Sequence, residues 1–170
     1  GDVLAMVEKN EFKTTLNIFY QNLCDVLQHY KSIIPILREE LDCILNDDIK
    51  SLNICLNKLQ IFSMQVKGFE KMIFEAQCRL NISAQTLSAM IQQMPEEEHL
   101  RFYSLLGQLE TTLKEVKFYQ GKCGDMIQTK LYKLDKMLSV IAIQKDLTLY
   151  RQDATEEPAI LFSKAFETTV

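Results

Sequence analysis

The sequence has few of the residues that interrupt helices. Its 170 residues include only five glycines, three prolines and no tryptophan. Glycine and proline mark the turns between short strands and the loops of many enzymes. Their scarcity favours an all-α fold and disfavours a β-rich one.

Long apolar runs and leader-like features are also missing. No uninterrupted apolar stretch approaches the ~20 residues that cross a membrane as a helix. The first residues do not combine a basic region with a hydrophobic stretch, as a secretion signal would. We therefore expect a cytoplasmic protein that does not insert into a membrane.

Catalytic signatures are absent. The sequence contains two histidines, no glycine-rich phosphate loop and no Gly-x-Ser-x-Gly motif. Its cysteines are odd in number and form no Cys-x-x-Cys pair, which indicates free thiols that are core residues or, alternatively, redox switches. They are Cys24, Cys43, Cys55, Cys78 and Cys123. We expect a protein that is not an enzyme and needs no cofactor.

One pair of residues has the spacing of a metal site. Glu96 and His99 stand three residues apart, as two ligands of one metal do in di-iron bundles. Those bundles need this motif twice and a carboxylate from each of two further helices, and no second copy exists in this sequence. We therefore expect no bound metal and interpret Glu96 as part of a helix start.

The charge of the chain argues against polyanionic partners. Its net charge of −4 would repel the phosphates of nucleic acids and of anionic membrane surfaces. Lys130, Lys133 and Lys136 form a basic row, which fits a solvated helix face better than a nucleic-acid patch. We expect no nucleic-acid partner.

Apolar residues recur at alternating steps of three and four, the pattern of amphipathic helices. The first such stripe covers residues 12–44 and crosses Pro35 in phase, which predicts one kinked helix rather than two. Residues 46–48, Asn-Asp-Asp, favour a turn, and a second stripe covers residues 49–80. So short a connection predicts an antiparallel hairpin.

The second half of the chain predicts a short helix and a long one. Ser83 has the character of an N-cap that starts a short helix, which carries Leu87, Met90, Ile91 and Met94. Pro95 and the three glutamates after it are typical of a helix start, and a third long stripe follows. Gly121 and Gly124 are its weak point, which predicts a bend or a close crossing there.

These stripes predict an all-α antiparallel bundle of three long helices plus a short connecting helix. We assign residues 1–150 to the bundle and residues 151–170 to a mobile, flexible tail with a short apolar segment. The methionine-bearing helix and the apolar tail exceed the needs of a three-helix core. Such residues either form a protein-binding surface or fold back onto the bundle.

Two stretches resemble the FlgN-type flagellar export chaperones. Leu-Arg-Glu-Glu-Leu at residues 37–41, the Asn-Asp-Asp turn, Leu52 and Lys58 are similar to that family's acidic helix end, turn, and following leucine and lysine. Thr148-Leu149-Tyr150 looks like the Thr-Tyr pair that opens the family's flexible tail. The chain departs from the family at Arg151-Gln152, where glycine is usual, and lacks two asparagines midway along the last helix.

The resemblance implies a partner and a site. It implies that flagellar hook-filament junction proteins bind through a C-terminal amphipathic helix against the C-terminal half of this chain, and that Tyr150 helps delivery to an export gate component. The candidate partner-binding residues are the apolar residues of that half: Leu134, Leu138, Ile141, Leu147, Leu149, Tyr150, Ile160, Leu161, Phe162 and Phe166. The alternative is a structural or signalling coiled-coil module that self-associates as a homo-oligomer, because the same stripes fit both functions.

Overall fold

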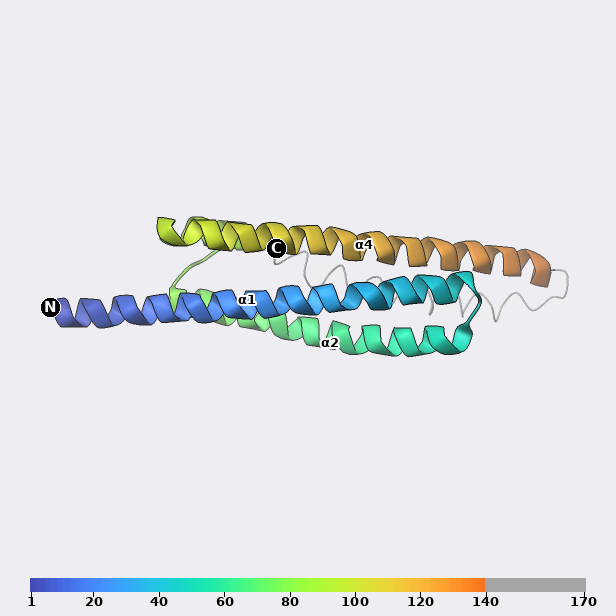
Figure 1. Ribbon diagram of the computed structural model, residues 1–170, viewed down its shortest axis with the longest axis horizontal. Helices are drawn as coiled ribbons and strands as arrows, with labels where there is room; N and C mark the ends of the chain where they lie inside the picture. Colours follow the sequence, from blue (N-terminus) through green and yellow to red (C-terminus); the bar gives the residue numbers. More distant parts are fainter. Residues whose placement is uncertain (140–170) are drawn as a thin grey trace.

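Four helices make up the described part of the protein. The computed structural model describes residues 1–139, which contain α1 (Asp2–Leu45), α2 (Ile49–Leu80), α3 (Leu87–Gln92) and α4 (Glu96–Leu138). The long helices lie side by side in an elongated bundle, with α2 running back along α1 and α4 running parallel to α1 (Figure 1). These residues include no β-strand, so the predicted all-α fold is confirmed. The predicted boundary at residue 150 and the tail lie outside the described residues.

Helix α1 is the central element of the bundle. It packs against both α2 and α4, whereas α2 and α4 approach one another little (Figure 1). Its predicted stripe is confirmed, because steps of three and four keep one face of a helix toward its neighbours. The residues of α1 that are each 1% exposed are Leu16, Phe19, Leu23, Val26, Tyr30, Ile33 and Leu37. The helix begins earlier than the stripe, and residues 1–11 are exposed.

Aromatic rings join α1 to both of its neighbours. Phe19 stacks on Phe102 of α4 with ring centroids 5.9 Å apart. Tyr30 meets Phe62 of α2 edge-on, with ring centroids 5.2 Å apart, and such pairs add to the stabilisation from burial alone.

Among residues 1–139, no helix combines the length and the apolar character that a membrane span needs.

Pro35 lies inside α1 without ending it. Proline has no N–H, so the carbonyl of Lys31 one turn earlier loses its helical hydrogen bond. Pro35 and Lys31 are both exposed, and that carbonyl can therefore be hydrated. The prediction of one helix across Pro35 rather than two is confirmed.

The turn between α1 and α2 forms where the Asn-Asp-Asp sequence predicted it. Asp47 adopts a left-handed φ of 56°, which aspartate tolerates better than most residues do. The Asp48 carboxylate accepts a hydrogen bond from the Ser51 N–H at 3.1 Å and caps α2. This bonding lowers the pKa of Asp48 below its ordinary value. The tight turn sets α1 and α2 antiparallel, as predicted.

The N-cap of α3 is Thr86, so the prediction of Ser83 was wrong. The Thr86 hydroxyl accepts a hydrogen bond from the Ala89 N–H at 3.2 Å. Residues 83 and 84 belong to the preceding loop, where two side-chain amides hold their carbonyls. Gln93 Nε2 donates to the Ser83 carbonyl at 2.8 Å, and Gln77 Nε2 donates to the Ala84 carbonyl at 2.6 Å.

Helix α3 is part of the core. Met90 and Ile91 are fully buried, Leu87 and Met94 nearly so, and the helix packs against α4. The alternative in which the methionine-bearing helix forms a binding surface is therefore wrong. The short helix lies alongside the first turns of α4 and buries its own apolar residues there.

Helix α4 starts as predicted, with Pro95 at the N-cap position and three glutamates in the first turn. It runs without interruption through Gly121 and Gly124. A Cβ added at either glycine would meet no atom within 4 Å, so the predicted close crossing at these glycines was wrong.

Candidate partner-binding pocket

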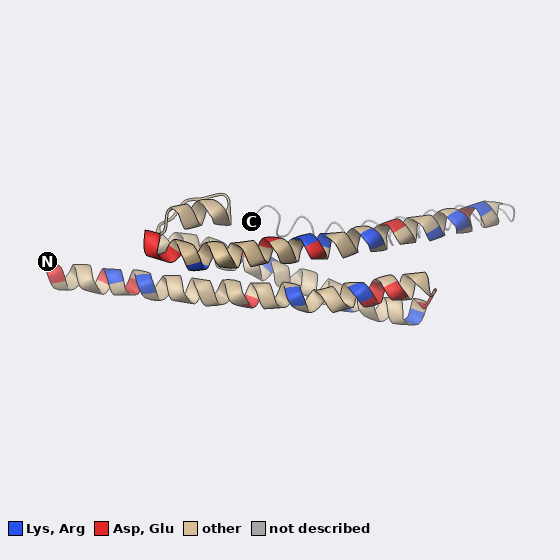
Figure 2. Cartoon of the chain, turned by 45° about the horizontal axis from the view of Figure 1, so that its top comes forward, with Lys and Arg blue, Asp and Glu red and all other residues tan. Residues whose placement is uncertain are grey.

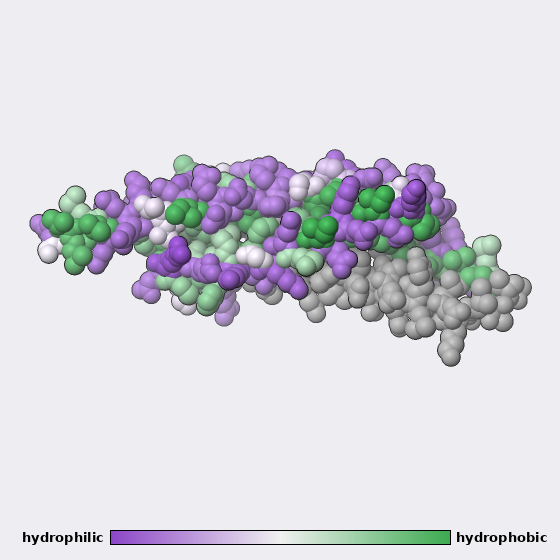
Figure 3. Space-filling model, turned by 90° about the horizontal axis from the view of Figure 1, so that it is seen from below, coloured by the Kyte–Doolittle hydropathy of each residue, from purple (hydrophilic) through white to green (hydrophobic). Residues whose placement is uncertain are grey.

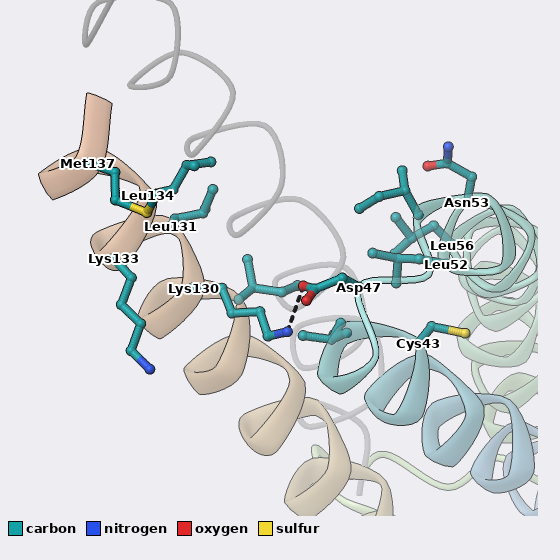
Figure 4. Close-up of a pocket in the computed structure, with 13 residues that line it drawn as sticks. Cys43, Asp47, Leu52, Asn53, Leu56, Lys130, Leu131, Lys133, Leu134 and Met137 are labelled. Carbon is teal, nitrogen blue, oxygen red and sulfur yellow. Dashed lines mark hydrogen bonds and ion pairs between the residues drawn. The ribbon is translucent and has the colours of Figure 1, made fainter. Parts of the chain in front are cut away.

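A pocket of about 670 Å³ opens at the end of the bundle where the turn between α1 and α2 lies beside the last turns of α4. We call it the end pocket. Its α2 wall consists of Ile49, Leu52, Asn53 and Leu56. Its α4 wall consists of Ile127, Lys130, Leu131, Lys133, Leu134 and Met137. Cys43, Ile44 and Asp47 close it at the end of α1, and the leucines of α4 face the α2 wall (Figure 4).

The end pocket exists because α4 continues past the turn that joins α1 to α2 (Figure 1). Along α4, Leu131 is 8% exposed beside the turn, whereas Leu134 is 39% and Met137 is 70% exposed beyond it. On the opposite wall Ile49 is about as exposed as these two. Apolar side chains that continue a core stripe into solvent are typical of a surface that another molecule covers.

Lys130 fixes the turn against α4. Its Nζ donates to the Asp47 carboxylate at 2.6 Å and to the Leu45 carbonyl at 3.2 Å (Figure 4). The second contact places a cation at the C-terminal end of α1, where the helix dipole favours positive charge. These contacts tie α4 to the end of α1 and to the turn that leads into α2.

A buried carboxyl group lies on α1 one helical turn before Cys43 and Ile44, which line the end pocket. Glu40 of α1 is 5% exposed and has no ion pair among the described residues. Burial raises the pKa of Glu40 to about 7, and a hydrogen bond with the Cys123 thiol lowers it in part. The cluster around Glu40 includes Cys123 of α4 and Cys55 of α2.

The thiols of this cluster are protonated near neutral pH. Burial raises the pKa of Cys55 to about 11 and that of Cys123 well above its ordinary value. The Cys123 thiol lies 3.7 Å from the Leu37 carbonyl, to which it donates. A protonated thiol is a poor nucleophile, so these residues act as small core side chains. Cys78, by contrast, is exposed.

The sequence missed Glu40, although a signal for it exists. The steps from Ile33 to Leu37, to Glu40 and to Ile44 are four, three and four, so Glu40 lies on the apolar stripe. The stripe also passes Leu41, and that leucine masked the polar residue beside it. Leu52 and Leu56 fall within the second predicted stripe, residues 49–80, and its periodicity does not mark them as pocket residues.

Two of the predicted partner-binding residues fall within the described part of the chain. Leu134 lines the end pocket. Leu138 is half-buried at the end of α4. Ile141, Leu147, Leu149, Tyr150, Ile160, Leu161, Phe162 and Phe166 lie outside the described residues.

The described residues contain no cluster of potential metal ligands. No group of three or more His, Cys, Asp or Glu side chains that could hold a metal ion occurs in this part of the chain. The ring of His99 bonds through Nε2 with the Met94 carbonyl at 2.9 Å, and Glu96 is exposed in the first turn of α4. The Glu96-x-x-His99 spacing thus belongs to the start of a helix.

A comparison with protein-family models matches residues 6–158 to the family described as FlgN protein. No curated protein and no solved structure matched the chain. The family match spans all four helices and most of the sequence. The chain therefore belongs to the FlgN family, whose members are flagellar export chaperones.

Proposed function

We propose that this chain is a cytosolic export chaperone for hook-filament junction proteins. In this proposal it binds the C-terminal amphipathic helix of the client, keeps the client unassembled and delivers it to the flagellar type III export gate. Membership of the FlgN family supports the general role. The end pocket is the observation that supports a helix-binding site on this particular surface.

The end pocket has the features that an amphipathic helix needs. Such helices dock by placing apolar anchors, three and four residues apart, into a groove. Leu134 and Met137 on one wall and Leu52 and Leu56 on the other offer apolar contacts from two helices. Because α2 and α4 approach one another little, a client helix lying between them can contact both.

The strength of such a contact suits a chaperone that must release its client. Full burial of a leucine or methionine side chain contributes about 1.5–3 kcal/mol relative to its exposed state. A few half-exposed anchors therefore give a moderate affinity after the cost of ordering the client helix is subtracted. Tyr150, which lies outside the described residues, is the residue that we propose contacts the export gate.

A second candidate function is self-association as a coiled-coil module. The first turns of α1 extend beyond the other helices and expose Val3, Leu4, Met6 and Val7, which form the green cluster at the left end of Figure 3. A second copy of the chain could cover this cluster. The oligomeric state, measured by light scattering after size-exclusion chromatography, distinguishes the two functions.

The test of the chaperone proposal is a binding titration with a purified C-terminal segment of a hook-filament junction protein. The pocket variant replaces Leu134 and Met137 with serine. The control variant replaces Ile61 and Met64, which are comparably exposed on α2 away from the pocket, with serine. Circular dichroism checks that both variants keep their helices.

We expect the unmodified chain and the control variant to bind the segment equally and the pocket variant to bind at least tenfold more weakly. Deletion of residues 149–170 should also reduce binding without loss of helicity. Equal binding by all variants would move the site away from the end pocket. No binding by the unmodified chain, together with a stable dimer, would favour the self-association function.

A further inference from the structure

The charged side chains that line the end pocket differ in whether they form an ion pair with another residue in the range 1–139. Three charged residues line it, and two of them, Asp47 and Lys130, pair with one another at 2.6 Å. Lys133 makes no ion pair with any residue in the described range 1–139. Lys133 belongs to the lining of the pocket, and in Figure 4 its side chain points away from Leu131 and Leu134 and from the α2 wall, toward the outer flank of α4.

Lys133 also has a defined place relative to the apolar contacts. It directly precedes Leu134 and lies four residues before Met137, so it neighbours Met137 on the helix surface. Lys133 therefore flanks the apolar surface of Leu134 and Met137, within reach of a long side chain on the flank of a helix that covers them. The residue that such a helix presents there then decides whether a charge pair or a charge clash forms.

The surrounding wall of α4 is basic. Lys130, Lys133 and Lys136 follow one another at three-residue steps near the end of α4, seen as the blue row in Figure 2. Lys136 lies over the Tyr132 ring at 4.7 Å. The whole chain carries a net charge of −4. A preference for acidic partners therefore cannot come from the molecule as a whole and has to come from this wall.

We infer that the end pocket receives a client helix with a carboxylate beside its apolar stripe, and that this carboxylate pairs with Lys133. The inference rests on the proposed chaperone function and specifies the chemistry of its partner. An acidic flank gains a pair at the pocket edge, whereas a basic flank meets like charge at Lys133 and at the lysines on either side. Lys133 thus contributes specificity, and the leucines contribute most of the affinity.

Two synthetic helices test the inference. They share the same apolar residues at positions i, i+3, i+4 and i+7, and they differ only in having glutamate or lysine along the flank. Fluorescence anisotropy at physiological salt gives the dissociation constant of each for the unmodified chain, for Lys133→Glu and for Lys114→Glu. Lys114 is an exposed lysine of α4 outside the end pocket, so its variant is the matched control.

We expect the glutamate helix to bind about tenfold more tightly than the lysine helix, since an exposed charge pair and the avoided clash each contribute a few-fold. Lys133→Glu should abolish or reverse this preference, and Lys114→Glu should retain it. Equal binding of the two helices, or a preference that survives Lys133→Glu, would overturn the inference and leave helix binding itself intact.

A third arm separates the inference from the function on which it rests. The C-terminal segment of a junction protein is titrated against the unmodified chain and Lys133→Glu. Weaker binding to Lys133→Glu supports the inference, and unchanged binding overturns it while the chaperone function stands. If neither the junction segment nor either synthetic helix binds the unmodified chain, the proposed function and the inference fail together.

Discussion

The most unusual single residue in this core is Glu40. It occupies a stripe position between Leu37 and Ile44 on the helix that both other long helices contact. Its surroundings contain thiols and apolar groups and no lysine or arginine that pairs with it among residues 1–139. A buried carboxylate without a cation is costly, so Glu40 keeps its proton to a higher pH than an exposed glutamate does.

The raised pKa of Glu40 predicts a pH-dependent stability. Its pKa is about 7 in the folded chain, against an ordinary value of 4.5. The folded state therefore holds a proton that the unfolded state has released between these values. The free energy of unfolding should fall as pH rises from about 4.5 through 7, by about 3 kcal/mol at most. Urea titrations at several pH values measure this slope.

Glu40→Gln is the variant that isolates this effect. It keeps the size of the side chain and cannot ionise, so its free energy of unfolding should depend less on pH and exceed that of the unmodified chain at pH 8. Glu39→Gln changes an exposed neighbour and is the control. Identical pH slopes for both variants would show that Glu40 is not the source.

At the scale of the helices, the sequence predicts the apolar stripes better than the helix ends. The buried face of a helix needs apolar residues at steps of three and four, and this spacing can be read directly from the sequence. The position of a cap depends on where the preceding loop ends, and contacts between residues distant in the sequence hold that loop. Ser83 and Thr86 are both good cap residues by type, and in the structure the amides of Gln77 and Gln93 bond the Ala84 and Ser83 carbonyls within the loop that precedes Thr86.

The capping contacts predict different costs for two similar substitutions. Thr86→Ala removes the hydroxyl that accepts the Ala89 N–H, which should lower the free energy of unfolding by about 1 kcal/mol. Ser83→Ala leaves the carbonyl that Gln93 contacts and should change it by less than about 0.5 kcal/mol. Urea denaturation compares the two, and an equal or larger loss for Ser83→Ala would contradict the assigned cap.

The glycines of α4 predict a gain in stability. Gly121 is exposed inside a continuous helix, and an added Cβ there meets nothing within 4 Å. Gly121→Ala should therefore raise the free energy of unfolding by up to about 1 kcal/mol, because alanine loses less backbone entropy in a helix. A thermal melt measures it as a rise of a few degrees. A lower melting temperature would show that the site needs glycine for another reason.

At the scale of the whole molecule, the end pocket could not be predicted from the periodicity. The third stripe continues in phase through Leu131 and Leu134, and the pattern alone assigns both to the core. Whether a residue is covered depends on where the neighbouring helices end relative to it. The offset between α4 and the turn after α1 is a property of the assembled bundle, and it converts the last turns of α4 from core into pocket wall.

This offset predicts that the same substitution, leucine to aspartate, costs very different amounts of stability at two positions one helical turn apart. Leu131→Asp places a carboxylate at a position that is 8% exposed and should lower the free energy of unfolding by about 3 kcal/mol or more, because the charge is buried without a partner. Leu134→Asp places it at a position that is 39% exposed, where water still reaches it. That change should cost about 1 kcal/mol or less.

Leu134→Asp should affect client binding rather than folding. Leu134→Asp is expected to keep its helices by circular dichroism and yet lose affinity for a junction-protein helix, since its carboxylate replaces an apolar contact of the end pocket. If Leu134→Asp unfolds the chain as Leu131→Asp does, the core continues to the end of α4 and the pocket wall belongs to the fold. If Leu134→Asp is stable and binds normally, the client helix lies elsewhere on the bundle.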